Sequence, residues 1–283
     1  MIDLLTAEKG REPKENEYIG AEGLIYCSVC NKPKQAITSG DFGSFVHITK
    51  CDCERKRAEQ EAERIRQIER MQQIEKLTKR CFGNNKILPH NTFENSELNT
   101  SAVNLCFNYC EKWQEVKAQN VNIILCGNVG SGKTYLACCI CNKLIADYYA
   151  SARFITEYDF LNGYMASDNK DAYICEVAGC SLLVLDDFGT KCFNKGRANG
   201  FLTYINDLID MRYKNGKPIV ITTNLSKDMF LKAHTTIEEQ RIFSRLQEMA
   251  GRPIEIKTSD LRISRADAKT AYLKSLLQEG EKK

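Results

Sequence analysis

From residue 121 onward, apolar and polar positions alternate in a way that predicts strands and helices in turn. Short apolar runs are separated by longer stretches with helical spacing, and the expected strands are residues 121–126, 152–156, 181–185, 218–223 and 253–256. Such alternation is typical of a parallel sheet with helices on both faces. A nucleotide would then bind at the carboxyl ends of the strands.

The N-terminal part of the chain has a different pattern. Residues 1–26 are polar without clear periodicity, and we expect a flexible or weakly ordered lead. Residues 54–80 are rich in Arg, Lys, Glu and Gln, which predicts one long exposed helix. Apolar side chains recur along it at every third position, a stripe that drifts around a regular helix: Ile65, Ile68, Met71, Ile74 and Leu77.

The stripe could pack on a partner helix or on the chain's own globular part. Basic residues outnumber glutamates in this helix, so a nucleic-acid or partner surface and a solvated linker both remain open. Glycine, asparagine and proline between residues 83 and 95 then predict a domain boundary.

Length and composition narrow the class of protein. At 283 residues and 32.2 kDa the chain can hold one α/β core and a smaller module. The formal net charge of +3 creates no strong overall field, so nucleic-acid binding would depend on local patches. No segment resembles a signal peptide or reaches the length of a membrane span. We therefore expect a cytoplasmic protein without membrane contacts.

Residues 127–134 read Gly-Asn-Val-Gly-Ser-Gly-Lys-Thr and stand between an expected strand and an expected helix. The pattern G-x-x-x-x-G-K-[ST] lets the backbone wrap a phosphate with no Cβ in the way. Lys133 is expected to reach the β and γ phosphates and Thr134 to bind Mg²⁺. A chance glycine-rich turn is the alternative. The pattern predicts binding of ATP or GTP by the loop and its flank: Gly127, Asn128, Val129, Gly130, Ser131, Gly132, Lys133, Thr134 and Tyr135.

Two later strands end in polar residues. The strand at 181–185 is followed by Asp186 and Asp187. Beside a nucleotide the first acid would order Mg²⁺ and the second would polarise the attacking water; a pair of turn or helix-capping aspartates is the alternative. Asn224 ends the strand at 218–223 and is placed to hydrogen-bond the γ-phosphate or the water, unless it only forms a turn.

Arg241 and Arg245 lie four residues apart in an expected helix and share one face. They either pair with acids on their own surface or complete a neighbouring subunit's active site as a transition-state finger. The sequence does not separate these two roles.

Four of the 14 cysteines have metal-ligand spacing. Cys27 and Cys30 form a C-x-x-C pair, Cys51 and Cys53 form a C-x-C pair, and the segment between them predicts a hairpin. Such pairs are typical of a tetrahedral Zn²⁺ site in a segment too small for a core. His47 could replace one cysteine, and a redox pair or unligated thiols are the alternatives. Nine further cysteines in or beside apolar stretches are expected to pack as small hydrophobic side chains: Cys106, Cys110, Cys126, Cys138, Cys139, Cys141, Cys175, Cys180 and Cys192.

In this order the motifs resemble the DnaC/DnaI-type helicase loaders, which belong with the IstB-like ATPases in the AAA+ superfamily. Besides the cysteine module, the charged linker and the phosphate loop, the resemblance rests on Thr-Phe-Glu-Asn at 92–95, Leu-Leu-Val-Leu-Asp-Asp-Phe-Gly at 182–189, Ile-Thr-Thr-Asn at 221–224 and Arg-x-x-x-Arg-Leu at 241–246. It covers residues 80–265, and the cysteine module more loosely.

The resemblance implies an α/β fold, an AAA+ P-loop NTPase with a five-stranded parallel sheet and little or no lid domain. A small zinc-binding, partner-docking module at 1–53 and a charged helical linker at 54–85 would precede the ATPase domain at 86–283. It also implies ATP hydrolysis, binding of single-stranded DNA, delivery of a hexameric replicative DNA helicase, and homo-oligomers with intersubunit ATP sites.

The resemblance also implies individual roles. It assigns phosphate and Mg²⁺ binding to Lys133 and Thr134, the Walker B acids to Asp186 and Asp187, sensor 1 to Asn224, the arginine finger to Arg245 with Arg241 as the alternate, and a sensor 2-like role to Arg262. Residues 157–167 match the helical insert that initiators and loaders use beside DNA, although this insert has few basic residues. The alternatives are an IstB-type transposition helper that recruits a transposase, and a nucleotide-gated binding module with little turnover.

Overall fold

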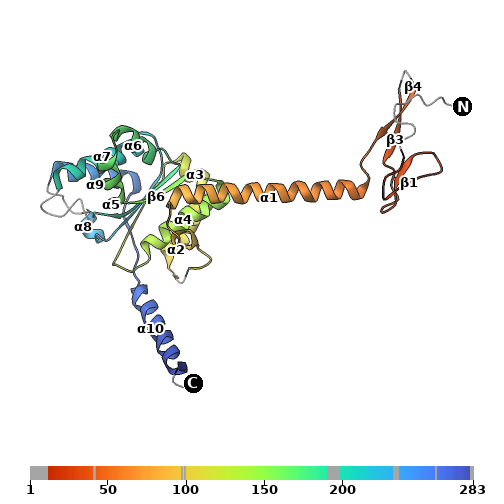
Figure 1. The fold of residues 1–283 in the computed structure, drawn as a ribbon. Helices are drawn as coiled ribbons and strands as arrows, with labels where there is room; N and C mark the ends of the chain where they lie inside the picture. The colour runs from red at the N-terminus through yellow and green to blue at the C-terminus, as the bar shows by residue number, and fades with distance from the viewer. Residues whose placement is uncertain are drawn as a thin grey trace. The chain divides into compact units, whose positions relative to one another are not determined.

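The computed structural model describes residues 12–40, 43–96, 98, 100–189, 198–231, 236–258 and 260–280 (Figure 1). The chain divides into two compact units, Met1–Gln72 and Gln73–Lys283. Within the described ranges, no helix is both long and apolar enough to cross a membrane.

The first unit contains two antiparallel strand pairs, followed by the greater part of a long helix. β1 (Glu17–Ile19) pairs with β2 (Ile25–Cys27), and β3 (Gln35–Gly40) pairs with β4 (Gly43–Ile48). The expected hairpin between the cysteine pairs is confirmed. The expectation of a weakly ordered lead is wrong from residue 17 onward. β1 forms because its backbone hydrogen-bonds to β2, and its own sequence has no apolar pattern that would predict a strand.

This unit buries few apolar side chains. Leu24 and Ile25 are buried, while Ile37 and Phe45 of the hairpin are exposed. A segment of this size needs a staple in addition to such a small core. Cys27 and Cys51 are among its other buried residues, so the cysteines are where that staple would be.

Helix α1 (Asp52–Phe82) confirms the predicted long helix and extends it by two residues at each end. Its acidic first turn and basic last turn complement the helix dipole. Ile74 and Leu77 pack against the core of the second unit. The apolar residues nearer the N-terminus are exposed: Ile65, Ile68 and Met71. A three-residue spacing rotates by about 60° per step around the helix, so one packing surface cannot cover the whole stripe.

The second unit is built on a parallel sheet, and the prediction of five strands is confirmed. They are β5 (Ile123–Cys126), β6 (Ala152–Thr156), β7 (Leu182–Phe188), β8 (Ile219–Thr223) and β9 (Ile254–Glu255), in the order β6-β7-β8-β5-β9. The four residues of β5 and the five of β8 are all buried, as expected for central parallel strands with both faces covered.

Helices cover both faces of this sheet (Figure 1). One core cluster joins β-strand side chains to α2 (Ser101–Glu111), α3 (Trp113–Ala118) and α4 (Lys133–Tyr148). The other cluster joins the opposite face to five helices: α5 (Glu157–Ala166), α6 (Lys170–Ala178), α7 (Ala198–Lys214), α8 (Lys227–Leu231) and α9 (Ile237–Ala250). The alternation is visible within β7, where Leu182 and Val184 face the first cluster and Leu183 and Leu185 the second.

A fully buried arginine fixes the start of β7. Arg212 of α7 donates through Nη1 to the carbonyl oxygens of Ala178 (2.9 Å) and Cys180 (2.5 Å), and through Nη2 to those of Ser181 and Pro218. These carbonyls belong to the last residue of α6, to the turn between α6 and β7 and to the residue before β8. The guanidinium therefore replaces water as their hydrogen-bond partner and ties the two strands that carry the polar residues of the site.

The packing prediction for the cysteines is confirmed in most cases. Six of the nine are buried, namely Cys106, Cys110, Cys126, Cys138, Cys139 and Cys141. Cys180 is half-buried. Cys175 is exposed on α6, so the packing prediction is wrong for Cys175. Cys192 lies outside the described residues.

Candidate functional site

The phosphate-loop sequence forms the turn between β5 and α4. Gly127, Gly130 and Gly132 have φ angles of 146°, 80° and 93°, which side chains with a Cβ rarely adopt. A Cβ on Gly127 would also lie 2.6 Å from the carbonyl oxygen of Ile256. The glycines therefore permit both the backbone path of the cradle and the close approach of the chain after β9.

Lys133 begins α4 and is buried inside the loop. Its Nζ donates to the carbonyl oxygens of Gly127 (3.0 Å) and Asn128 (2.8 Å). Burial lowers the pKa of Lys133, while the charges of Asp187 and Asp186 act in the opposite direction. An ammonium group held among carbonyl oxygens of a glycine loop is a suitable partner for phosphate oxygens.

Thr134 and Asp186 meet beside the loop. The Thr134 hydroxyl donates to Oδ1 of Asp186 at 3.0 Å. Burial raises the pKa of Asp186 to about 6; the like charge of Asp187 adds to this, and the hydroxyls of Thr222 and Thr134 oppose it. A hydroxyl and a carboxylate are the hard oxygen donors that Mg²⁺ prefers, so this pair fits a magnesium ion accompanying a triphosphate.

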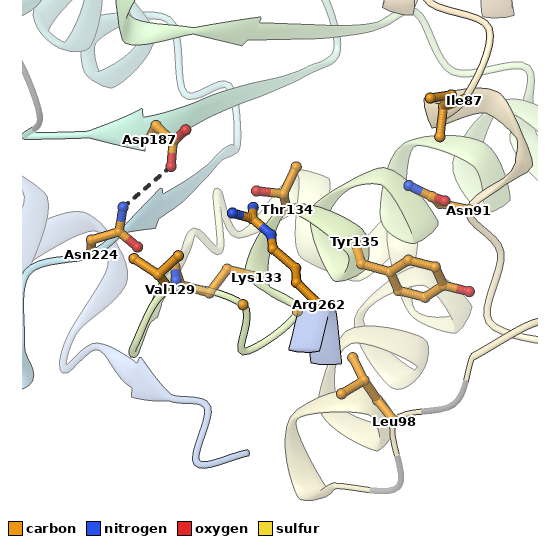
Figure 2. A pocket seen from close by; sticks show the side chains of 12 residues that line it. Ile87, Asn91, Leu98, Val129, Lys133, Thr134, Tyr135, Asp187, Asn224 and Arg262 are labelled. Carbon is orange, nitrogen blue, oxygen red and sulfur yellow. Dashed lines mark hydrogen bonds between the residues drawn. The ribbon is translucent and has the colours of Figure 1, made fainter. Parts of the chain in front are cut away.

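Asp187 and Asn224 lie together at the ends of β7 and β8. The Asn224 side-chain amide donates to Oδ1 of Asp187 at 3.5 Å (Figure 2). Asp187 has a φ of 55°, an uncommon left-handed conformation for a residue other than glycine. The two strands thus bring a carboxylate and an amide to one point at the carboxyl edge of the sheet.

These residues surround a cavity of about 280 Å³ with a polar and an apolar part. Figure 2 shows Asp187 and Asn224 on one side, and Ile87, Leu98 and Tyr135 on the other. The polar lining consists of Lys133, Thr134, Asp187, Asn224 and Arg262, and the remaining lining residues are Ile87, Asn91, Leu98, Val129, Gly130, Gly132 and Tyr135. The cavity therefore offers cationic and polar groups for phosphates and an apolar wall for a base.

The sequence does not predict Ile87, Asn91 and Leu98 at the site, because the Gly, Asn and Pro residues between 83 and 95 indicate a domain boundary and Leu98 follows without any motif. The segment is held on α4 by side chains: the amide of Asn142 donates to the carbonyl oxygens of Leu88 (3.0 Å) and Asn91 (2.8 Å). Contacts of this kind, between residues about 50 positions apart, leave no periodic signal in the sequence.

Arg262 reaches the cavity from the start of α10 (Leu261–Gly280). The chain before it crosses the phosphate loop: the Thr258 hydroxyl donates to the carbonyl oxygen of Ser131 at 3.1 Å. Asp260 lies against the loop, because a Cβ on Gly130 would be only 1.8 Å from its Oδ1. The same Oδ1 accepts a hydrogen bond from the backbone N–H of Arg262 at 2.9 Å. The loop and the start of α10 are therefore in direct contact.

The structure does not bring Arg241 and Arg245 to this cavity. Nη1 of Arg245 forms an ion pair with Asp210 at 2.8 Å and donates to Asn206 at 3.4 Å. Arg241 is exposed, and within the part of the chain that the structure describes it makes no ion pair or side-chain hydrogen bond. The two arginines share a helix but have different surroundings.

The four predicted zinc ligands form a separate cluster. The sulfur atoms of Cys27, Cys30, Cys51 and Cys53 all lie within 4.8 Å of one another, and Cys53 is 3.2 to 3.5 Å from the other three. Backbone hydrogen bonds, first that of Cys53, lower the pKa of Cys30 to about 6, whereas hydrogen bonds from the neighbouring cysteine side chains raise that of Cys53 and burial raises that of Cys51. The support for a metal site is therefore the convergence of the four sulfur atoms. The cluster is compatible with zinc, whose tetrahedral sites take four thiolates.

His47 is not part of the cysteine cluster. Its Nδ1 is hydrogen-bonded to the Thr38 hydroxyl at 3.2 Å across the hairpin. The alternative in which His47 replaces a cysteine is therefore not supported by the geometry.

Known proteins match both the sequence and the fold. The family described as IstB-like ATP binding protein matches residues 54–256. YqaM, an uncharacterized protein of Bacillus subtilis (strain 168), is 27% identical over 144 residues, a match that covers 50% of this chain and 44% of YqaM, less than half the length of that relative. Crystal structures of DnaI and of the DnaC helicase loader are both 19% identical, with TM-scores of 0.51 and 0.50. They cover 63% and 61% of this chain, and 94% and 100% of their own. These structural likenesses establish an AAA+ fold.

Proposed function

The chain belongs to the IstB-like ATP-binding protein family, and from this premise we propose that it hydrolyses ATP in order to deliver a hexameric replicative DNA helicase to single-stranded DNA. The observation that carries the proposal is the convergence of Lys133, Thr134, Asp187, Asn224 and Arg262 on one cavity at the carboxyl edge of the sheet. The likeness of the fold to DnaI and to the DnaC helicase loader supports the choice of partner.

In the proposed mechanism each side chain has a separate task. Lys133 and the loop N–H groups would bind the β and γ phosphates, and Thr134 and Asp186 would hold Mg²⁺. When bound, that ion would neutralise charge that develops on the phosphate oxygens. Asp187 orients and polarises the attacking water, Asn224 contacts the water or the γ-phosphate from β8, and Arg262 contacts the phosphates from α10.

The apolar wall of the cavity is the proposed base site. Ile87 and Leu98 would contact the faces of the base, and Asn91 is the amide that lines this part. We propose ATP rather than GTP because the family is described as ATP-binding.

An arginine of a neighbouring subunit would complete the site. Arg245 remains the first candidate by position in the motif, and Arg241 is the alternate with the more accessible side chain. Either assignment requires an oligomer in which α9 of one subunit faces the nucleotide of the next, because neither residue lines the cavity of its own chain.

The N-terminal region would dock the helicase. We propose a zinc-binding, partner-docking module at residues 1–53, with Cys27, Cys30, Cys51 and Cys53 as ligands, a helical linker at 54–85 and the ATPase domain at 86–283. The insert helix α5 would lie beside the DNA. We also propose a cytoplasmic location, because the expected partners are a replicative helicase and DNA.

Steady-state ATPase assays test the enzymatic part. Lys133→Ala and Asp187→Asn are expected to lower turnover by about 100-fold or more, because each removes a group that acts on the transferring phosphoryl group or its water. Lys117→Ala, an exposed lysine of α3, is the matched control and should leave the rate unchanged. A parent protein that binds ATP without turnover would instead support the nucleotide-gated binding module.

Capture experiments test the partner. The full chain, immobilised with ATP, should retain a hexameric replicative helicase, and substitution of Cys27 and Cys30 by serine should abolish retention. The family takes its name from IstB, and we therefore propose an IstB-type transposition helper as the second candidate function. Retention of a transposase in place of the helicase would establish that second candidate.

A further inference from the structure

The strand that carries the two acids contains a β-bulge. β7 and β8 pair Leu185 with Ile221 and Phe188 with Thr223. Between these pairs β7 has two residues, Asp186 and Asp187, where β8 has only Thr222. A bulge of this kind leaves one residue without its ladder hydrogen bond and turns its side chain to a new direction.

The bulge requires an unfavourable backbone conformation. Asp187 has a φ of 55°, in the left-handed region that residues with a Cβ adopt uncommonly. Local contacts must hold this conformation against the regular strand. Its N–H group, taken out of the ladder, also needs an acceptor because the surrounding strands are buried.

The side chain of Thr222 contacts both residues of the bulge. The Thr222 hydroxyl accepts the N–H of Asp187 at 3.0 Å and donates to Oδ1 of Asp186 at 2.5 Å. A hydroxyl has one proton to donate, so these two bonds fix its orientation: the proton points to Asp186 and a lone pair to Asp187. Thr222 is fully buried and does not line the cavity.

We propose that Thr222 is the positioning residue for both acids of the site. Its hydroxyl holds the Asp186 carboxylate in place for Thr134 and Mg²⁺, and it fixes the Asp187 backbone so that the Asp187 carboxylate meets Asn224. This role deepens the proposed ATPase function and rests on it. Asn224 follows the last residue of β8 and donates to Asp187, so a displacement of Asp187 would also change its contact with Asn224.

The next residue in the strand provides a matched control. Thr223 is equally buried, and its hydroxyl donates to the carbonyl oxygen of Phe188 at 2.7 Å and accepts the N–H of Leu225 at 3.1 Å. Its hydroxyl therefore also makes one hydrogen bond as donor and one as acceptor, but it bonds to neither acid. Thr223→Val removes the same chemical group as Thr222→Val at an adjacent position.

The experiment compares Thr222→Val, Thr222→Ser and Thr223→Val in the full chain. The measurements are kcat and KM for ATP, and the Mg²⁺ concentration that half-saturates binding of a fluorescent ATP analogue. Thr222→Val should lower kcat about 10- to 100-fold and raise the required Mg²⁺ about tenfold, with KM and Mg²⁺-free analogue binding within about threefold. Thr222→Ser, which keeps the hydroxyl, should have a kcat and a Mg²⁺ requirement close to those of the parent protein. Thr223→Val should also have values close to those of the parent protein.

Equal losses in Thr222→Val and Thr223→Val, or no loss in Thr222→Val, would overturn the proposal, since a general packing defect would affect both positions. If the parent protein binds the analogue but shows no turnover, the ATPase function fails while the Mg²⁺ titration still decides the role of Thr222. Absence of analogue binding by the parent protein would overturn both. If Thr222→Val does not fold, Thr222→Cys replaces it, because a thiol is only a weak hydrogen-bond donor.

Discussion

Arg245 of α9 is bound to Asp210 of α7, with 2.8 Å between Nη1 and Oδ1, and both side chains are only partly exposed. The guanidinium also lies over the ring of Tyr213, 5.5 Å from its centre. An Arg245 side chain that completes a neighbouring site must give up these contacts. Arg241, one turn earlier, has none to give up among the described residues.

Subunit-mixing experiments separate the two arginines. Arg245→Ala and Arg241→Ala chains are each mixed with Lys133→Ala chains, and ATP hydrolysis of the mixture is compared with that of the separate proteins. The variant that lacks the finger should regain activity at mixed interfaces, where an intact arginine meets an intact phosphate loop. Asp210→Asn is the matched variant, because it breaks the ion pair of Arg245 and leaves the arginine in place. If Arg245 is the finger, this variant should hydrolyse ATP at the parent rate or faster. No regained activity with either arginine variant would contradict an intersubunit site.

Asp186→Asn is expected to stabilise the protein in the absence of nucleotide and Mg²⁺. The folded-state pKa of Asp186 is raised to about 6 by burial, so the carboxyl group binds its proton more tightly in the folded state than in the unfolded state. Its contribution to stability is present at low pH and is lost as the pH rises through about 6. Asparagine has no charge to bury, and the variant should unfold with a free energy about 1–3 kcal/mol higher at pH 8.

Denaturant titrations at pH 4.5 and pH 8 measure this difference. The gain should shrink toward pH 4.5, where the aspartic acid is protonated in the folded protein. Asp168→Asn, at an exposed loop position, is the control and should change little at either pH. A gain of equal size at both pH values would show that charge burial is not its cause.

Gly127→Ala should weaken nucleotide binding and not only reduce stability. The new Cβ would lie 2.6 Å from the carbonyl oxygen of Ile256, and the backbone of the loop would have to move away from it. Gly216→Ala is the matched control, because Gly216 also has a positive φ, 56°, but a Cβ there would meet nothing within 4 Å.

Both variants should lose about 1–3 kcal/mol of stability, because a residue with a Cβ is strained at either positive φ angle, and denaturant titration measures this loss. Only Gly127→Ala should weaken binding of the fluorescent ATP analogue, by about tenfold or more. Equal binding by the two variants would mean that the loop tolerates a Cβ at its first position.

Metal analysis of the purified chain should find about one Zn²⁺ per molecule. Cys51→Ser should lose that zinc, because Cys51 is one of four converging sulfur ligands. Cys175→Ser is the control, since Cys175 is an exposed thiol outside the cluster. Chelator should unfold the N-terminal unit of the parent protein, which circular dichroism and limited proteolysis would detect. A stable N-terminal unit without metal would refute the structural role of zinc.

Much of the fold could be predicted because its signals are local. The apolar runs before Gly127, Asp186 and Asn224 mark buried parallel strands, and their polar last residues mark the edge where a ligand binds. The apolar wall of the cavity could not be predicted in this way. Ile87 and Leu98 belong to an irregular segment whose position depends on hydrogen bonds from Asn142 to backbone carbonyls, and such contacts have no period.

The sequence by itself determined the chemistry that is available: a glycine loop with Lys133 and Thr134, two acids after one strand, an amide after another, and four cysteines with ligand spacing. Only the tertiary structure decided which groups meet. It placed Thr222 between the two acids, tied Arg245 to Asp210, and brought Arg262 back to the loop from the end of the sheet. The physical reason is that residue type and spacing fix local geometry, whereas a hydrogen bond across strands depends on register, and here a single extra residue in β7 sets that register.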